Sequence, residues 1–298
     1  MGAAIAALMP IARSIPRIPV PDLLPASHPR PRAAARLRER IEADARAACQ
    51  SSYLGDHTSL CRVLGKFLCY VDTRDRHLAP HLIMNGFWEP WITVAIAQRL
   101  QPGMICVDVG ANLGYFTMLL ADLVGPSGAV LAFEPNPRLL ELCKSSLSAN
   151  GFRGRAVATG LAASDRDGQD VQLTFDLASP MNGTITGGNH AGSTTVRTVR
   201  LDTACANLPR VDFFKIDVEG AEELVWDGMQ GLLDKNPHAT VVMEWNAKRN
   251  GAERLLDKVS SRFPTLRHIG FDSEVEEITR ERLLTERGAE DFMLFLRR

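Results

Sequence analysis

The chain has 298 residues, of which 45% are hydrophobic and 23% are charged, and its formal net charge is −1 at pH 7. This composition is typical of a globular protein long enough for one large α/β domain and an appendage. Because the net charge is close to zero, the chain has no overall field that would attract nucleic acid or anionic lipid. We therefore expect no nucleic-acid partner.

The cysteines favour a reducing compartment. They form no C-x-x-C pair and are too sparse for a disulfide scaffold; they are Cys49, Cys61, Cys69, Cys106, Cys143 and Cys205. We interpret them as reduced, mostly structural thiols, which predicts a cytoplasmic protein.

The N-terminal part of the chain predicts an appendage to a main domain. Residues 1–11 are apolar, but they lack a basic segment and are too short to span a bilayer, so we expect no stable membrane anchor. Prolines recur between residues 15 and 31 and predict an extended arm, and apolar spacing from 33 to 48 predicts a surface helix. Two roles stay open for this arm and helix, namely a homodimer contact or a cover over a cleft.

We predict three regions: an arm and helix over 1–55, an N-terminal cap segment over 56–102, and a main domain over 103–298. The cap segment has a strand pattern at 62–70 and a helix pattern at 89–100. The main domain alternates strand and helix patterns at 104–109, 115–123, 129–133, 138–149 and 156–162. Such alternation is typical of parallel strands joined by crossover helices.

The alternation breaks between residues 171 and 201, where two strand patterns flank a glycine-rich loop and predict an inserted hairpin. Strand patterns at 211–217 and 238–243 resume the sheet. Two further strands, including the apolar run at 292–296, are expected to end the chain and to include an antiparallel edge.

The strand pattern at 104–109 runs into a glycine loop and then a helix, which predicts a cradle for a small molecule. A dinucleotide site requires G-x-G-x-x-G, whereas the spacing here is D-x-G-x-x-x-G from Asp108 through Gly110 to Gly114. A carboxylate at Asp108 would repel a diphosphate. The loop therefore favours a cationic ligand such as S-adenosylmethionine, which carries an ammonium and a sulfonium, and it argues against a nicotinamide oxidoreductase.

A second acid, Glu134, ends the next strand pattern about twenty residues further on, where nucleotide-binding folds place a carboxylate on ribose hydroxyls. Asn136 follows as a helix cap before Pro137 at the first helical position. The alternative is an ordinary strand, turn and helix with a solvated glutamate.

Two more acids, Asp217 and Glu219, follow the strand pattern at 211–217, at the end where open α/β sheets bind ligands. Methyl transfer requires an aligned acceptor and a group that takes up its proton, and one carboxylate near the methyl group suffices. These acids can also cap the following helix, and the two roles are compatible.

The chain resembles the FkbM family of S-adenosylmethionine-dependent methyltransferases. The resemblance rests on Val-Asp-Val-Gly-Ala-Asn-Leu-Gly-Tyr-Phe-Thr at 107–117, Phe-Glu-Pro-Asn at 133–136 and Lys-Ile-Asp-Val-Glu-Gly-Ala-Glu at 215–222. It implies a class I, Rossmann-like α/β fold with a mostly parallel twisted sheet and helices on both faces. It also implies O-methylation of a hydroxyl on a sugar, a glycolipid or a secondary metabolite, and hence a small-molecule or glycan acceptor.

The resemblance also implies roles for individual residues. The residues expected to bind the methionine part of the cofactor are Asp108, Gly110, Asn112, Gly114 and Thr117. The residues expected to bind the ribose and the adenine are Glu134, Asn136, Ser164 and Asp165. Asp217 faces the sulfonium, and the acceptor's proton goes to Glu219 or Glu244; the resemblance does not choose between them.

The segment 85–93 also resembles this family through its aromatic-Glu-Pro pattern. Aromatic side chains can stack on a sugar and exclude water, although a packing role for the tryptophans is equally open. The expected substrate residues are Trp88, Glu89, His81, Asn182 and His190.

Other functions remain as alternatives. A noncatalytic cofactor-binding module is disfavoured by the intact acids, and an N-methyltransferase by Asp-Val-Glu-Gly where such enzymes often carry an Asn/Asp-Pro-Pro-aromatic turn. Asp217, Glu219 and Glu244 are hard oxygen ligands, but their spacing is not a metal signature, so we predict no metal site.

Overall fold

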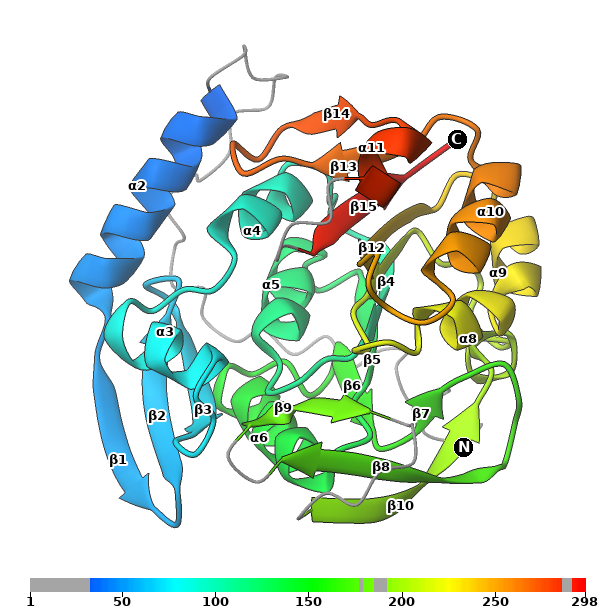
Figure 1. Ribbon diagram of the computed structural model, residues 1–298. Helices are drawn as coiled ribbons and strands as arrows, with labels where there is room; N and C mark the ends of the chain where they lie inside the picture. Colours follow the sequence, from blue (N-terminus) through cyan, green and yellow to red (C-terminus); the bar gives the residue numbers. More distant parts are fainter. Residues whose placement is uncertain (1–32, 177–178, 185–191, 286–290) are drawn as a thin grey trace.

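An eight-stranded mixed sheet forms the centre of the molecule, with strand order β14-β13-β15-β12-β11-β4-β5-β6 (Figure 1). The computed structural model describes residues 33–176, 179–184, 192–285 and 291–298. The strands are β4 (Ile105–Val109), β5 (Ala129–Phe133), β6 (Ala156–Thr159), β11 (Phe213–Ile216), β12 (Thr240–Trp245), β13 (Arg267–Ile269), β14 (Val275–Glu277) and β15 (Phe292–Leu296).

The five strands from β6 to β12 are parallel, which confirms the predicted α/β class. The antiparallel pairs lie at the C-terminal end of the chain. β15 pairs antiparallel with β12 and with β13, and the edge strand β14 pairs antiparallel with β13. The central strands β4, β11 and β12 are buried along their whole length, as expected for strands covered on both faces.

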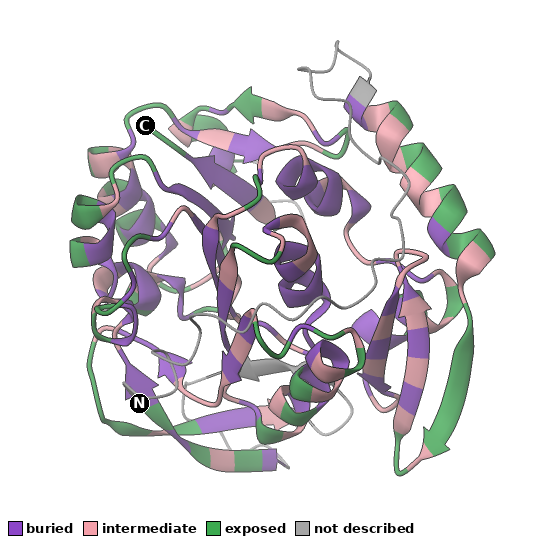
Figure 2. Cartoon of the chain, turned by 180° about the vertical axis from the view of Figure 1, so that it is seen from behind, coloured by how far each residue is buried: buried purple, intermediate pink, exposed green. Residues whose placement is uncertain are grey.

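Helices cover both faces of this sheet and enclose two separate apolar clusters. One cluster contains side chains of α4 (Pro90–Ala97), α5 (Tyr115–Leu123) and α6 (Pro137–Ala149). The other contains side chains of α7 (Leu201–Ala204), α8 (Glu222–Asp227), α9 (Gln230–Lys235), α10 (Ala252–Arg262) and α11 (Arg280–Thr285). Figure 2 shows the central strands in the buried colour and the exposed residues along the outer elements.

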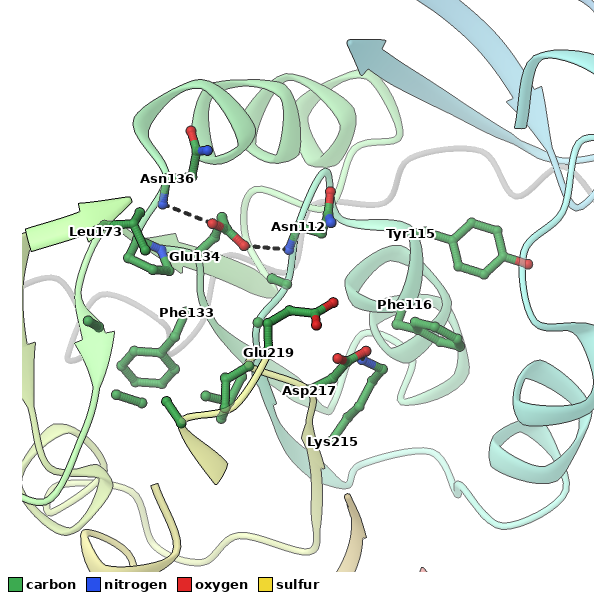
Figure 3. A pocket seen from close by; sticks show the side chains of 18 of the residues that line it. Asn112, Tyr115, Phe116, Phe133, Glu134, Asn136, Leu173, Lys215, Asp217 and Glu219 are labelled. Carbon is green, nitrogen blue, oxygen red and sulfur yellow. Dashed lines mark hydrogen bonds and ion pairs between the residues drawn. The ribbon is translucent and has the colours of Figure 1, made fainter. Parts of the chain in front are cut away.

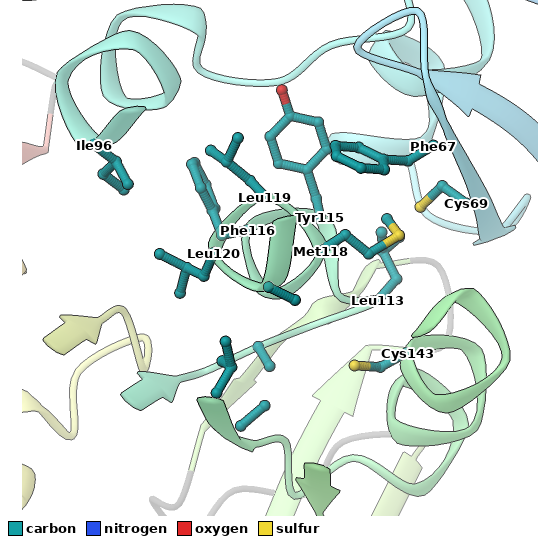
Figure 4. Close-up of a cluster of buried hydrophobic side chains, with 14 of the residues drawn as sticks. Phe67, Cys69, Ile96, Leu113, Tyr115, Phe116, Met118, Leu119, Leu120 and Cys143 are labelled. Carbon is teal, nitrogen blue, oxygen red and sulfur yellow. The ribbon is translucent and has the colours of Figure 1, made fainter. Parts of the chain in front are cut away.

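Helix α5 is buried on all sides, because it lies between the sheet and the N-terminal region (Figure 4). The rings of Tyr115 and Phe116 meet edge to face with centroids 5.1 Å apart. The Tyr115 hydroxyl also lies 3.3 Å from Thr93 Oγ1 on α4. These contacts fix the beginning of α5, which directly follows the glycine loop.

The N-terminal region begins with the predicted helix, α2 (Ala33–Ala48), and continues into a three-stranded antiparallel sheet of β1 (Ser51–Gly55), β2 (Thr58–Val63) and β3 (Phe67–Asp72). We predicted one strand over 62–70, and this was wrong: the chain turns back at Leu64 and Gly65, both at positive φ. The predicted boundary after residue 55 lies in the β1–β2 turn. A short helix, α3 (Leu78–Met84), follows β3.

The predicted insertion forms a second sheet with strand order β7-β10-β8-β9. Its strands are β7 (Ala162–Ala163), β8 (Asp170–Asp176), β9 (Ser179–Thr184) and β10 (Gly192–Val199). The antiparallel pairing of β8 with β10 confirms the predicted hairpin, and β9 adds a strand that the sequence pattern did not indicate. The predicted proline-rich arm lies outside the described residues. Among the described helices, none has the length and apolar character needed to cross a bilayer.

Candidate active site

A pocket opens at the carboxyl ends of β4, β5 and β11, the edge at which parallel sheets bind their ligands (Figure 3). The loops after these three strands form most of its wall. The lining residues are Leu78, Trp88, Val109, Gly110, Ala111, Asn112, Tyr115, Phe116, Phe133, Glu134, Pro135, Asn136, Ala162, Ala163, Leu173, Lys215, Asp217, Val218, Glu219 and Ala221.

The three loops are tied to one another by backbone contacts. The amide of Gly110 donates to the carbonyl of Phe133 over 2.9 Å, and the amide of Asp217 donates to the carbonyl of Val109 over 3.0 Å. Gly110 has φ +80°, and a β-carbon there would lie 1.7 Å from the carbonyl oxygen of Asp217. Glycine is therefore required for β4 and β11 to meet at the pocket.

Glu134 is held rigidly in the pocket wall. One of its carboxylate oxygens accepts from the amide of Asn112 and the other from the amide of Asn136, both over 2.8 Å. Burial raises the pKa of Glu134 to about 7, although the two amides lower it. Asn136 also caps α6, as predicted, because its side chain accepts from the amides of Arg138 and Leu139.

Asp108, Thr117 and Gly114 lie behind the pocket wall and are not among its lining residues in the described part of the chain. Asp108 and Thr117 are fully buried, and the Thr117 hydroxyl donates to Asp108 Oδ2 over 2.6 Å. Gly114 precedes α5, and a β-carbon there would lie 2.9 Å from Cys143 Sγ on α6. Their contacts therefore set the position of α5 beneath the loop.

Lys215 and Asp217 form an ion pair of 3.0 Å in the pocket, with the lysine ammonium 4.8 Å from the centre of the Phe116 ring. Burial lowers the pKa of Lys215, but the carboxylates of Asp217 and Asp108 outweigh burial and raise it, so the lysine stays charged. Sequence analysis gave Lys215 no role. The available signal was a lysine inside a buried strand, two residues before an acid.

Glu219 and Glu244 meet at the guanidinium of Arg249, which follows β12. Arg249 Nη2 lies 3.0 Å from Glu219 Oε2, and Nη1 lies 2.5 Å from Glu244 Oε2 and from Glu222 Oε1. Glu219 lines the pocket and is left-handed, with φ +53°. Glu244 is buried and is not a lining residue among those described. From the sequence we assigned no role to Arg249, and none to Glu222 beyond its place in the motif at 215–222.

Burial raises the pKa of Glu219 to about 7, and the negative charge of Asp217 adds to this, while Arg249 opposes it. Burial and Asp217 also raise the pKa of Glu244. The alternative role of Asp217 and Glu219 as helix caps is not observed, since α8 begins at Glu222 after Ala221 with no side-chain cap.

The segment before α4 contributes Trp88 to the pocket. The His81 ring packs edge to face on Trp88 with centroids 5.1 Å apart, and His81 itself is exposed. Glu89 is left-handed, with φ +40°, and its buried Oε2 has no hydrogen-bond partner among the described residues. Burial, followed by the charge of Asp217, raises the pKa of Glu89 to about 8.

The remaining predicted residues lie elsewhere or outside the described structure. Ser164 and Asp165 follow β7 and bond to each other over 3.2 Å, and Ala162 and Ala163 line the pocket in their place. Asn182 belongs to β9, where its side chain is not described, and His190 lies outside the described residues. The described residues contain no group of three or more acids, histidines or cysteines suited to a metal ion.

The fold and the site define a class I methyltransferase. The Methyltransferase FkbM domain matches residues 108–280, which is more than half of the chain, so the chain belongs to the FkbM methyltransferase family. S-adenosylmethionine is the methyl donor of this class.

Similarity to individual relatives is partial. The chain is 29% identical over 153 residues to Methyltransferase 1 of Beauveria bassiana, which covers 44% of this chain and 59% of the relative. It is 48% identical over 54 residues to protein-L-isoaspartate O-methyltransferase of Aeropyrum pernix, which covers 18% of this chain and 21% of that enzyme. The O-methyltransferase of Bacillus cereus, solved with SAH, matches with a TM-score of 0.40 and 14% identity over 70% of this chain and 78% of that one.

The residues of the pocket fit this donor. Glu134 presents a fixed carboxylate in the wall, which can accept from ribose hydroxyls through its remaining lone pairs. Asp217 and Glu219 also present carboxylates to the pocket, paired with Lys215 and Arg249, and a carboxylate suits a sulfonium (Figure 3).

Proposed function

We propose that the protein transfers a methyl group from S-adenosylmethionine to a hydroxyl oxygen of a small-molecule or glycan acceptor, with Glu219 as the general base. The observation that carries this proposal is the Glu219 carboxylate, which lines the pocket beside Asp217 and has its pKa raised to about 7. A base with a pKa near the working pH is the most effective acceptor of a proton.

The chain's own residues bind and align the donor. Glu134 takes the ribose hydroxyls, Asn112 and the backbone from Gly110 border the methionine part, and Asp217 faces the sulfonium with its charge balanced by Lys215. When bound, the donor supplies a methyl group that the sulfonium has already activated for displacement. Trp88 and Phe116 line the pocket, and their apolar rings can exclude water from the bound methyl group.

The reaction balances with one base. The acceptor oxygen forms the new C–O bond as the C–S bond breaks, and the C–S electron pair returns to sulfur and neutralises its charge. Glu219 receives the hydroxyl proton. Glu244 is disfavoured as the base because it is buried and is not among the described lining residues, whereas Glu219 lines the pocket itself.

Glu219→Gln tests the proposal, with Glu223→Gln as the matched control. Glu223 lies four residues away and pairs with Arg254 and Lys258 away from the pocket. With ¹³C-methyl S-adenosylmethionine and a metabolite extract or a panel of sugars, Glu219→Gln should lower turnover about 100-fold or more and leave donor affinity by calorimetry within a few-fold. Full turnover by this variant would overturn the role of Glu219, and an N-methyl product in the NMR spectrum would overturn O-methylation.

A further inference from the structure

Arg249 forms ion pairs with three carboxylates, which belong to two segments that are distant in sequence. Glu219 and Glu222 belong to the segment between β11 and α8, and Glu244 belongs to β12. In the part of the chain that the structure describes, no other basic residue forms an ion pair with any of the three. The guanidinium is therefore their shared counter-charge.

The loop that carries Arg249 is itself well anchored. The Arg249 amide donates to the carbonyl of Asn246 over 3.1 Å, and the carbonyl of Arg249 accepts from the amide of Ala252 at the start of α10 over 3.2 Å. The Asn246 side chain donates to Asp291, just before β15. The Arg249 side chain is only 20% exposed, and its loop is anchored. We therefore expect its planar guanidinium to be held in one position.

Glu219 needs such a partner for two reasons. Its backbone is left-handed, a conformation that a residue with a β-carbon adopts only when surrounding contacts hold it there. Its carboxylate also lies among like charges, which favour the protonated form and so remove the base. The charged groups that act on it, besides Lys215 through its pair with Asp217, are Asp217, Glu222, Glu244, Asp291, Glu89 and Arg249.

We propose that Arg249 is a positioning residue for methyl transfer: its guanidinium fixes the Glu219 carboxylate at the pocket and keeps it in the ionised form that accepts the proton. The inference rests on the proposed role of Glu219 as the base. Arg249 is not a lining residue among those described, so it acts through Glu219 and not on the acceptor.

The direct test is the titration of the Glu219 side-chain carboxyl by ¹³C NMR in the protein without ligands, with the signal assigned by its loss in Glu219→Gln. Removal of a positive charge 3.0 Å away raises the pKa of a carboxyl group, so the midpoint in Arg249→Gln should rise by about one pH unit or more. Arg249→Lys keeps the charge without the fork and should fall between Arg249→Gln and the natural protein. An unchanged midpoint in Arg249→Gln overturns the inference.

Arg254→Gln is the matched control, because Arg254 also pairs with a glutamate of α8 from the start of α10, but on the surface. It should leave the Glu219 midpoint unchanged. If Arg249→Gln does not fold, Arg249→Lys alone carries the test, and a midpoint equal to that of the natural protein together with unaltered turnover overturns the inference.

The pH dependence of kcat/KM gives a second measurement. In Arg249→Gln the rising limb should move to higher pH, with a loss of about fivefold at pH 7 that recovers at alkaline pH, because a base with a pKa of about 7 is half ionised there and one with a pKa one unit higher is about one tenth ionised. A merely structural role predicts an equal loss at every pH, and that result overturns the inference. Full turnover by Glu219→Gln would instead overturn the proposed function, so the two failures are distinguishable.

Discussion

Gly110 and Asp217 approach so closely that any side chain on the glycine would enter the carbonyl of the aspartate, since its β-carbon would lie 1.7 Å from that oxygen. The contact joins the glycine loop after β4 to the segment after β11 that carries Glu219. A change at Gly110 should therefore affect both the glycine loop and the segment that carries the proposed base.

Gly110→Ala should destabilise the protein by about 3 kcal/mol, because it combines a left-handed backbone with a steric clash. It should also weaken donor binding at least tenfold, because the loop must shift away from β11. Denaturant unfolding and calorimetry measure the two effects. Gly154→Ala is the control, since a β-carbon there meets nothing within 4 Å. Equal stability of the two variants would show that the loop does not need this contact.

Thr117→Val should act on stability more than on donor binding. It leaves the buried carboxylate of Asp108 without its hydroxyl donor, which costs about 2 kcal/mol. Thr117→Ser keeps the hydroxyl and should lose much less. Unfolding in urea measures the difference. A tenfold loss of donor affinity in Thr117→Val at unchanged stability would contradict this. It would support the role that the family resemblance implies, in which Thr117 binds the methionine part of the donor.

Much of this site could be predicted because its signals are local. The glycine loop, Glu134 and the Asn136 cap each depend on a few neighbouring residues that follow a strand pattern. The predicted helix cap is confirmed, because the Asn136 side chain accepts from the amides two and three residues ahead. Such a cap can be recognised from a few consecutive residues.

The other parts depend on packing between distant segments. Arg249 is separated from Glu219 by 30 residues and reaches it only because β12 lies beside β11 in the sheet. The position of β15 between β12 and β13 likewise depends on contacts between distant segments, and no local pattern in the sequence indicates it. The turn at Leu64 was missed because leucine seldom adopts a positive φ.

Glu134 should make stability depend on pH in the protein without donor. Its pKa is raised to about 7 in the folded state, above its ordinary value of 4.5, so the folded state binds the proton more tightly than the unfolded chain. The stabilisation is therefore full below pH 4.5 and is lost as the pH rises through 7, by about 3 kcal/mol.

Glu134→Gln should remove this part of the pH dependence, because an amide does not titrate. The measurement is urea unfolding between pH 4.5 and 8 for both proteins, compared by slope because the variant also loses one amide contact at every pH. Glu141→Gln, at an exposed position on α6, should keep the natural slope. If Glu134→Gln has the natural slope too, Glu134 is ionised throughout that range.

Lys215→Met should destabilise the protein more than the same substitution at an exposed lysine does. It removes the cation that pairs with Asp217 in the pocket wall and that lies near the buried carboxylate of Asp108. Breaking a fully buried pair by removing one partner costs about 3 to 5 kcal/mol; because the Asp217 side chain is 26% exposed, we expect a cost of about 2 to 3 kcal/mol and a fall of several degrees in the melting temperature. Lys144→Met, at an exposed position on α6, is the control. Because Met has a side chain of similar size without the charge, equal stability of Lys215→Met and Lys144→Met would show that the ammonium charge does not stabilise the fold at this position.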